Sequence, residues 1–185
     1  MSDLTRDRLR PYPIFRGCGP EELDRLLACI TEWRLPTSEM VLFEEKVDSD
    51  SAYIVESGLL VAELPLDGGV KVEMARMGPG AVVGELCLIT AGPRSLRVKC
   101  LQPTAMLRID RRQFEALRQA QDSAAYSVIR NICLTMCDRL RSTNDFIERE
   151  LRHEMPTRAA ETRMGRQSVA ERAREYLSEL FGRKR

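Results

Sequence analysis

The spacing of apolar and polar residues divides the chain into a helical beginning, a strand-rich middle and a helical end. After the helix-start sequence Gly19-Pro20-Glu21-Glu22, apolar residues recur at helical spacing at Leu23, Leu26, Leu27 and Ile30. From residue 32 to about residue 109, short apolar runs alternate with turns rich in Gly, Pro, Asp and Ser. This change of pattern predicts β-strands at residues 40–43, 52–55, 58–64 and 96–101.

The turns between these runs indicate how the strands are connected. Asp67-Gly68 joins the runs 64–66 and 70–72, and this sequence is typical of a β-hairpin. The run 96–101 alternates apolar and polar residues, as a strand with one buried face does. Many short strands with regular turns predict a sandwich or a barrel.

The end of the chain is predicted to be helical. Asp110 is expected to cap a helix that contains Phe114 and Leu117. A longer helix is predicted from residue 123 to about His153, where Met155-Pro156-Thr157 breaks it. Its apolar stripe, at Ile129, Ile132, Met136 and Leu140, is longer than a small sandwich covers. The stripe either packs on the sandwich alone or also contacts the same helix of a second subunit, and we predict such a homodimer.

Composition narrows the possible partners. The chain has 185 residues, of which 43% are hydrophobic, and 29 basic side chains nearly balance 28 acidic ones. This balance argues against general polyanion binding, and 5% aromatic residues argue against a platform for single-stranded nucleic acid. No apolar run is long enough to span a bilayer and the first residues are polar, so we expect a cytoplasmic protein without a membrane span.

The six cysteines are expected to be free thiols that pack as small apolar residues. Cys133 and Cys137 share a helical face and form at most half of a metal site. Since His153 is the single histidine of the chain, we predict no metal.

The richest stretch chemically runs from Gly84 to Ser95. Gly84 permits unusual backbone angles and close approach of a ligand, and the N–H groups of Glu85, Leu86 and Cys87 would open a helical turn. The turn Gly92-Pro93 brings back Arg94, whose planar fork suits a phosphate, with the Ser95 hydroxyl beside it. Glu85 would accept a hydrogen bond from a sugar hydroxyl. The stretch therefore predicts a pocket for a sugar phosphate, or else a surface turn in which Glu85 and Arg94 form a salt bridge.

This stretch resembles the phosphate-binding cassette of cyclic-nucleotide-binding domains of the catabolite activator and protein kinase A regulatory type. Other motifs resemble the family in order, namely residues 13–15, 21–23, 53–58, 78–80, 108–110 with Phe114, and 138–140. The resemblance implies an α+β fold, a β-jelly-roll flanked by N-terminal helices and a long C-terminal helix. It also implies three parts, an arm at 1–11, the cyclic-nucleotide-binding domain at 12–153 and an amphipathic helical extension at 154–185.

In this family the Gly-Glu pair binds the ribose 2′-hydroxyl and the Arg binds the cyclic phosphate, which implies Gly84, Glu85 and Arg94 here. Thr143 and Asn144 fall where the family contacts the base, and they either bind it or are solvated helix positions. Leu96 stands where the family often has Ala, and it either crowds the pocket or packs inward. The family often has Gly at Ser38 and at Lys46 or Val47, so those turns are expected to be reshaped.

The resemblance implies a non-catalytic sensor that binds cAMP or cGMP and relays occupancy through its C-terminal helices to an effector protein. The alternative is an interaction module that kept the fold and lost the ligand. An enzyme with Glu85 as acid–base and Arg94 as anion clamp is disfavoured, because no nucleophile–base pair accompanies them. About thirty residues follow Pro156, too few for a helix-turn-helix, so we predict no sequence-specific DNA binding.

Overall fold

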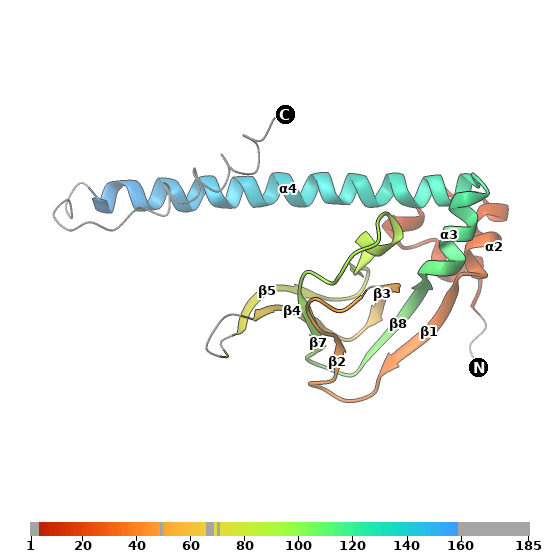
Figure 1. Ribbon diagram of the computed structural model, residues 1–185, viewed down its shortest axis with the longest axis horizontal. Helices are drawn as coiled ribbons and strands as arrows, with labels where there is room; N and C mark the ends of the chain where they lie inside the picture. The colour runs from red at the N-terminus through yellow and green to blue at the C-terminus, as the bar shows by residue number, and fades with distance from the viewer. Residues whose placement is uncertain (1–3, 49, 66–68, 70, 159–185) are drawn as a thin grey trace. The chain divides into compact units, whose positions relative to one another are not determined.

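The computed structural model describes residues 4–158 apart from 49, 66–68 and 70. The helices are α1 (Arg6–Leu9), η1 (Pro13–Phe15), α2 (Pro20–Leu27), η3 (Glu85–Leu88), α3 (Arg111–Gln119) and α4 (Ser123–Arg158). The strands are β1 (Ile30–Leu35), β2 (Val41–Phe43), β3 (Ser51–Ser57), β4 (Leu60–Pro65), β5 (Lys71–Met77), β6 (Val82–Val83), β7 (Arg97–Cys100) and β8 (Thr104–Asp110). Figure 1 shows these elements along the chain. The predicted change from helices to strands and back to helices is confirmed.

Two antiparallel sheets of four strands form the middle of the chain. One sheet has the order β1-β8-β3-β6 and the other has the order β2-β7-β4-β5. Apolar side chains of both sheets form the core, at Leu35, Tyr53, Val55, Leu60, Ala62, Val83, Val98, Cys100 and Met106. Inward and outward positions alternate along β7, as the sequence predicts, because its outer face is solvated. The α+β fold with a β-jelly-roll is confirmed.

Strand pairing confirms the predicted hairpin. β4 and β5 are antiparallel neighbours, with Leu64 opposite Val72 and Pro65 opposite Lys71. Residues 66–68 and 70 of its turn lie outside the described part of the chain. The predicted cap of α3 is also confirmed, since the Asp110 side chain accepts a hydrogen bond of 3.0 Å from the Gln113 N–H.

The N-terminal residues are held by charge as well as by packing. Leu9 of α1 is fully buried. Arg8 donates to both oxygens of the Glu56 carboxylate, at 2.8 and 2.6 Å, and also pairs with Glu32. These contacts fasten α1 to β1 and β3, so the predicted arm contains a short helix that packs on the sandwich.

Two helix boundaries differ from the prediction. α2 ends at Leu27, and Ile30 opens β1 opposite Ile109, so the expectation that Ile30 belongs to the helix is wrong. The Cys29 N–H donates to the Leu26 carbonyl, and this tight turn redirects the chain into the sheet, where Ile30 is buried. α4 continues through Pro156 to Arg158, so the predicted break before it is also wrong. Pro156 has no N–H and so cannot donate to the carbonyl four residues before it, but the helix continues past this position.

The first turns of α4 contact the N-terminal segment of the chain. Ala124, Ala125, Val128 and Ile132 are buried, and Asn131 donates to the Ile14 and Arg16 carbonyls at 3.0 and 2.8 Å. Contacts divide the chain into the units Met1–Leu134 and Thr135–Arg185, and the start of α4 belongs to the first. The boundaries predicted at 12 and 153 stay predictions, and the amphipathic segment predicted within 154–185 lies largely outside the described residues.

The cysteines are only partly as expected. Cys29, Cys87 and Cys100 are buried, whereas Cys133 and Cys137 are exposed. The expectation of burial is wrong for this pair because both lie on the face of α4 opposite to Val128 and Ile132. Burial raises the pKa of the Cys29 thiol to about 11, so this thiol stays protonated at neutral pH.

Candidate functional site

The cassette begins at a glycine in the left-handed region, which glycine adopts more readily than residues with a β-carbon. Gly84 has φ +71° and ψ 21°, in the left-handed region, and η3 follows at once. The Cys87 N–H donates to the Gly84 carbonyl at 3.3 Å and closes the predicted helical turn. A β-carbon on Gly84 would lie 3.0 Å from Cζ of Arg94 and closer still to Nη1. The absence of a side chain at Gly84 therefore makes room for the Arg94 guanidinium.

Backbone hydrogen bonds bring Arg94 to this place. The Arg94 N–H donates to the Val47 carbonyl and the Lys46 N–H donates to the Arg94 carbonyl, both at 2.8 Å. Lys46 has φ +63°, so this turn keeps a left-handed residue even though the expected glycine is replaced. The turn at Ser38 also contains a left-handed residue, since Glu39, which follows Ser38, has φ +64°.

The guanidinium of Arg94 is buried and is held by neutral groups. Its Nη2 donates to the Ser51 carbonyl at 2.5 Å and its Nη1 donates to the Gly84 carbonyl at 3.2 Å. Its Cζ lies 4.1 Å from the centre of the Phe43 ring, in cation–π contact. The side chain is 7% exposed, and Nε is buried without a hydrogen-bond partner in the described structure.

Arg94 forms no ion pair with a carboxylate in the described part of the chain. The alternative of a surface salt bridge between Glu85 and Arg94 therefore does not describe this turn. A buried cation is costly unless an anion or several dipoles compensate it. Two carbonyls and an aromatic ring provide part of that compensation here, and the unpaired Nε marks a donor suited to an anion.

The other predicted cassette residues differ in how exposed they are. Glu85 and Cys87 are buried, at 5% and 4% exposed, whereas Leu86 is 48% exposed and Ser95 is exposed. Glu85 is thus a buried carboxylate in the turn that Arg94 contacts through Gly84. Leu96 packs against the core cluster between the sheets, which favours the inward-packing alternative over crowding of the pocket.

Thr143 and Asn144 lie on α4 in the unit Thr135–Arg185. Both are exposed, and the Thr143 hydroxyl donates to the Arg139 carbonyl at 2.9 Å. Their contact with a base stays a prediction.

Sequence reasoning missed three participants in the site. The Phe43 ring lies under the Arg94 guanidinium, and the Ser51 carbonyl accepts a hydrogen bond from it. Arg111 donates from Nε to the Cys87 carbonyl at 3.0 Å. Phe43 was recognised only as a strand residue. The carbonyls of Ser51 and Cys87 leave no trace in the sequence, because every residue has one.

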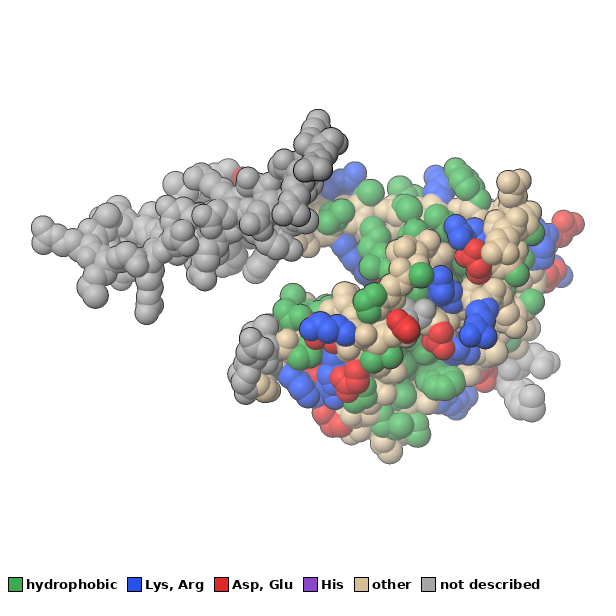
Figure 2. Space-filling model, in the orientation of Figure 1, with side chains coloured by type: hydrophobic (Ala, Val, Ile, Leu, Met, Phe, Trp, Pro, Cys, Tyr) green, Lys and Arg blue, Asp and Glu red, His purple; other side chains and the backbone are tan. Residues whose placement is uncertain are grey.

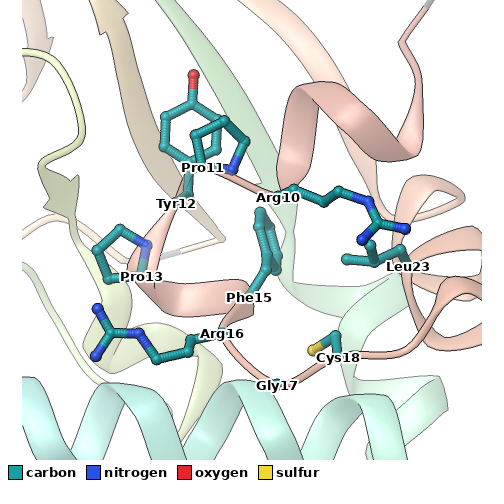
Figure 3. A pocket seen from close by; sticks show the side chains of 9 residues that line it. All are labelled: Arg10, Pro11, Tyr12, Pro13, Phe15, Arg16, Gly17, Cys18 and Leu23. Carbon is teal, nitrogen blue, oxygen red and sulfur yellow. The ribbon is translucent and has the colours of Figure 1, made fainter.

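A pocket in the N-terminal part of the chain is lined by none of the cassette residues. It has a volume of about 240 Å³ and is lined by Arg10, Pro11, Tyr12, Pro13, Phe15, Arg16, Gly17, Cys18 and Leu23. Figure 3 shows the Arg10 and Arg16 side chains pointing away from one another. Arg10 also pairs with Asp7 at 3.2 Å. The pocket therefore lacks converging charges, and none of the predicted site residues lines it.

Three further properties of the described residues concern surface charge, grouped metal ligands and membrane-spanning helices. On the face drawn in Figure 2, basic and acidic side chains are intermixed. Among the residues that the structure describes, no three His, Cys, Asp or Glu side chains are grouped as metal ligands. No helix in the same part of the chain has the length and apolar character needed to cross a bilayer.

Known proteins share this domain. The family model for the cyclic nucleotide-binding domain matches residues 33–121, which include the whole cassette. The cyclic AMP receptor protein of Thermus thermophilus is 26% identical over 136 residues, covering 74% of this chain and 61% of that protein. An uncharacterised NTE family protein of Mycobacterium bovis is 34% identical over 116 residues, covering 63% of this chain and 19% of that protein.

A solved cyclic-nucleotide-binding structure is also similar to this chain. The regulatory domain of Toxoplasma gondii PKA, crystallised with cAMP, has a TM-score of 0.55 and 26% identity, covering 60% of this chain and 42% of that one. This chain spans less than two thirds of the length of each relative, so the likeness concerns the domain. Residues 33–121 of this chain are similar to the cyclic nucleotide-binding domain family.

Proposed function

We propose that this domain binds a cyclic nucleotide, cAMP or cGMP, and acts as a non-catalytic sensor. The observation that carries the proposal is the buried Arg94 guanidinium, which has an unpaired Nε and lies against the left-handed Gly84. The names of two relatives support the choice of ligand, since one is a cyclic AMP receptor protein and another was crystallised with cAMP.

Each cassette residue has a role in the proposed complex. Arg94 faces the cyclic phosphate, and its Nε donates to a phosphate oxygen. The charge-assisted bond is about twice as strong as a neutral one. Gly84 lets the sugar phosphate approach the backbone, and Glu85 accepts a hydrogen bond from the ribose 2′-hydroxyl. Leu86 and Cys87 contribute the turn, and Ser95 lies beside the phosphate.

The proposed output runs through the C-terminal helices to an effector protein in the cytoplasm. A ligand shifts a conformational equilibrium only if it binds one state more tightly than the other. The proposed base contacts of Thr143 and Asn144 would provide that difference, since they lie on α4 rather than in the cassette. Homodimerisation through α4 belongs to the same proposal and is supported by exposed apolar side chains, since Tyr126 is 70% and Leu140 is 64% exposed.

The alternative of a ligand-free interaction module has lost its main support. Leu96 favoured it as a residue that would fill the pocket, but Leu96 packs on the core cluster. Whether the folded protein binds a nucleotide distinguishes the sensor from the interaction module.

Equilibrium unfolding in urea with added nucleotides tests the proposal. A ligand that binds only the folded state adds about 2.7 kcal/mol to the free energy of unfolding at a hundredfold excess over its Kd. We expect cAMP or cGMP to raise the urea midpoint, with 5′-AMP as the control nucleotide. Arg94→Met should abolish the increase, and Arg76→Met should keep it, because Arg76 is exposed and pairs with Glu73. An unchanged midpoint at millimolar cAMP and cGMP would refute the sensor.

A further inference from the structure

A closed ring of hydrogen bonds connects the cassette to the first residue of α3. Arg111 follows β8 directly, and its Nε–H donates to the Cys87 carbonyl at 3.0 Å. Its backbone N–H donates to the Asp50 carbonyl at 2.9 Å. One side chain thus contacts the last part of the cassette turn, while its own backbone contacts the residue that precedes β3.

Arg94 closes the ring from the other side. Ser51 follows Asp50, and its carbonyl accepts from Nη2 of Arg94 at 2.5 Å. Nη1 of the same guanidinium donates to Gly84, which opens the turn that contains Cys87. The ring therefore has a phosphate-facing arginine on one side and a helix-starting arginine on the other.

Hydrogen bonds hold α3 at both of its ends. Its start is capped by Asp110, and Phe114 anchors its apolar face with 1% exposure. Its last turn is tied to the next connection, since the Asp122 N–H donates to the Leu117 carbonyl at 3.0 Å. The Arg111 side chain thus joins the Cys87 carbonyl to the start of α3.

We propose that Arg111 is a positioning residue that transmits occupancy of the cassette to α3 through its hydrogen bond to the Cys87 carbonyl. The inference rests on the proposed function, because the signal begins with a cyclic nucleotide at Arg94. It adds a residue that makes no contact with the nucleotide and acts only on the backbone of the cassette turn. A packing role alone would need the aliphatic stem of Arg111 and not its Nε–H donor.

Two variants separate the donor from the packing. Nε of arginine and Nε2 of glutamine are the same number of bonds from Cα, so Arg111→Gln keeps an N–H donor there and removes the charge. Arg111→Met places a methyl group at that position and removes the donor. Arg112→Met, at the adjacent exposed arginine, is the control for loss of a charge.

The measurement is amide hydrogen exchange of residues 84–88 and 111–119, with and without 1 mM cAMP or cGMP, beside the Kd from calorimetry. We expect the nucleotide to slow exchange in both segments of wild type, Arg111→Gln and Arg112→Met. In Arg111→Met we expect slowing in residues 84–88 alone, with Kd raised by less than about tenfold, since the variant removes one donor to the Cys87 carbonyl and no contact to the nucleotide. Equal slowing of residues 111–119 in Arg111→Met and wild type would overturn the inference while leaving the sensor intact.

Wild-type protein that binds neither nucleotide would instead overturn the sensor and this inference together. A second measurement needs no substitution and covers a variant that fails to fold. The Nε–H resonance of Arg111 in wild type should shift as cAMP or cGMP is titrated. If the amides of residues 84–88 shift and this resonance does not, the proposed transmission through Arg111 is wrong.

Discussion

Gly84→Ala tests whether the left-handed glycine exists to make room for Arg94. The added β-carbon would lie 3.0 Å from Cζ of Arg94, whereas carbon atoms normally approach to about 3.5–4.0 Å. The guanidinium must therefore move by about 1 Å, since Nη1 is nearer still. A move of this size lengthens the 3.2 Å bond to the Gly84 carbonyl beyond hydrogen-bond range.

The expected effects are on stability and on binding. A left-handed alanine costs about 1–2 kcal/mol, and the lost hydrogen bond of the cation costs about 1.5–3 kcal/mol more. The free energy of unfolding, measured in urea, should therefore fall by about 2.5–5 kcal/mol. Displacing Arg94 should also weaken cyclic nucleotide binding by roughly 10- to 100-fold, which calorimetry measures.

Gly80→Ala is the matched control. Gly80 has φ +87°, and a β-carbon there would meet no atom within 4 Å. This variant should lose about 1–2 kcal/mol of stability from its backbone angle and should bind nucleotide as wild type does. If Gly84→Ala also bound with unchanged affinity, the reasoning that links Gly84 to Arg94 would be refuted.

Three further substitutions test contacts that hold the site and the fold. Phe43→Leu removes the ring under the guanidinium, and calorimetry should show an affinity lower by about 3- to 30-fold, since a desolvated cation–π contact contributes about 0.5–2 kcal/mol. Asn131→Ala removes the two hydrogen bonds between α4 and the loop before α2, and urea unfolding should show a loss of about 1–3 kcal/mol. Burial alone would raise the pKa of Glu63, but hydrogen bonds from Arg97 and Lys99 outweigh burial and lower this pKa. The resulting stabilisation is present above the ordinary Glu pKa of about 4.3 and is lost as pH falls through the lower folded value, so Glu63→Gln should flatten the decline in unfolding free energy between about pH 5 and pH 3.

Local signals in the sequence predicted that Gly84 and Arg94 lie close together. Gly84 and Arg94 are ten positions apart in the chain, so a glycine start and a Gly-Pro return were enough to bring them together. The strands were recognisable because turn residues punctuate them. That pattern predicted a sandwich or a barrel, whereas the jelly-roll came from resemblance to a family.

The errors have physical causes. Ile30 fits both a helical period and a strand, and its pairing opposite Ile109 decides for the strand. Cys133 and Cys137 were expected to be buried because apolar residues surround them in sequence, yet helical geometry turns both outward. The Ser51 carbonyl is 43 positions from Arg94 and is a backbone group, so no sequence pattern marks it as a partner.

The most direct test of the account is calorimetric titration of cAMP and cGMP into wild-type protein and into Arg94→Lys, which keeps the charge and loses the planar fork. The account predicts saturable binding of one of these nucleotides by wild type, with one ligand for each chain, and affinity at least about tenfold weaker in the variant. Folded wild-type protein that binds neither nucleotide at millimolar concentration, or a variant that binds as tightly as wild type, would contradict it.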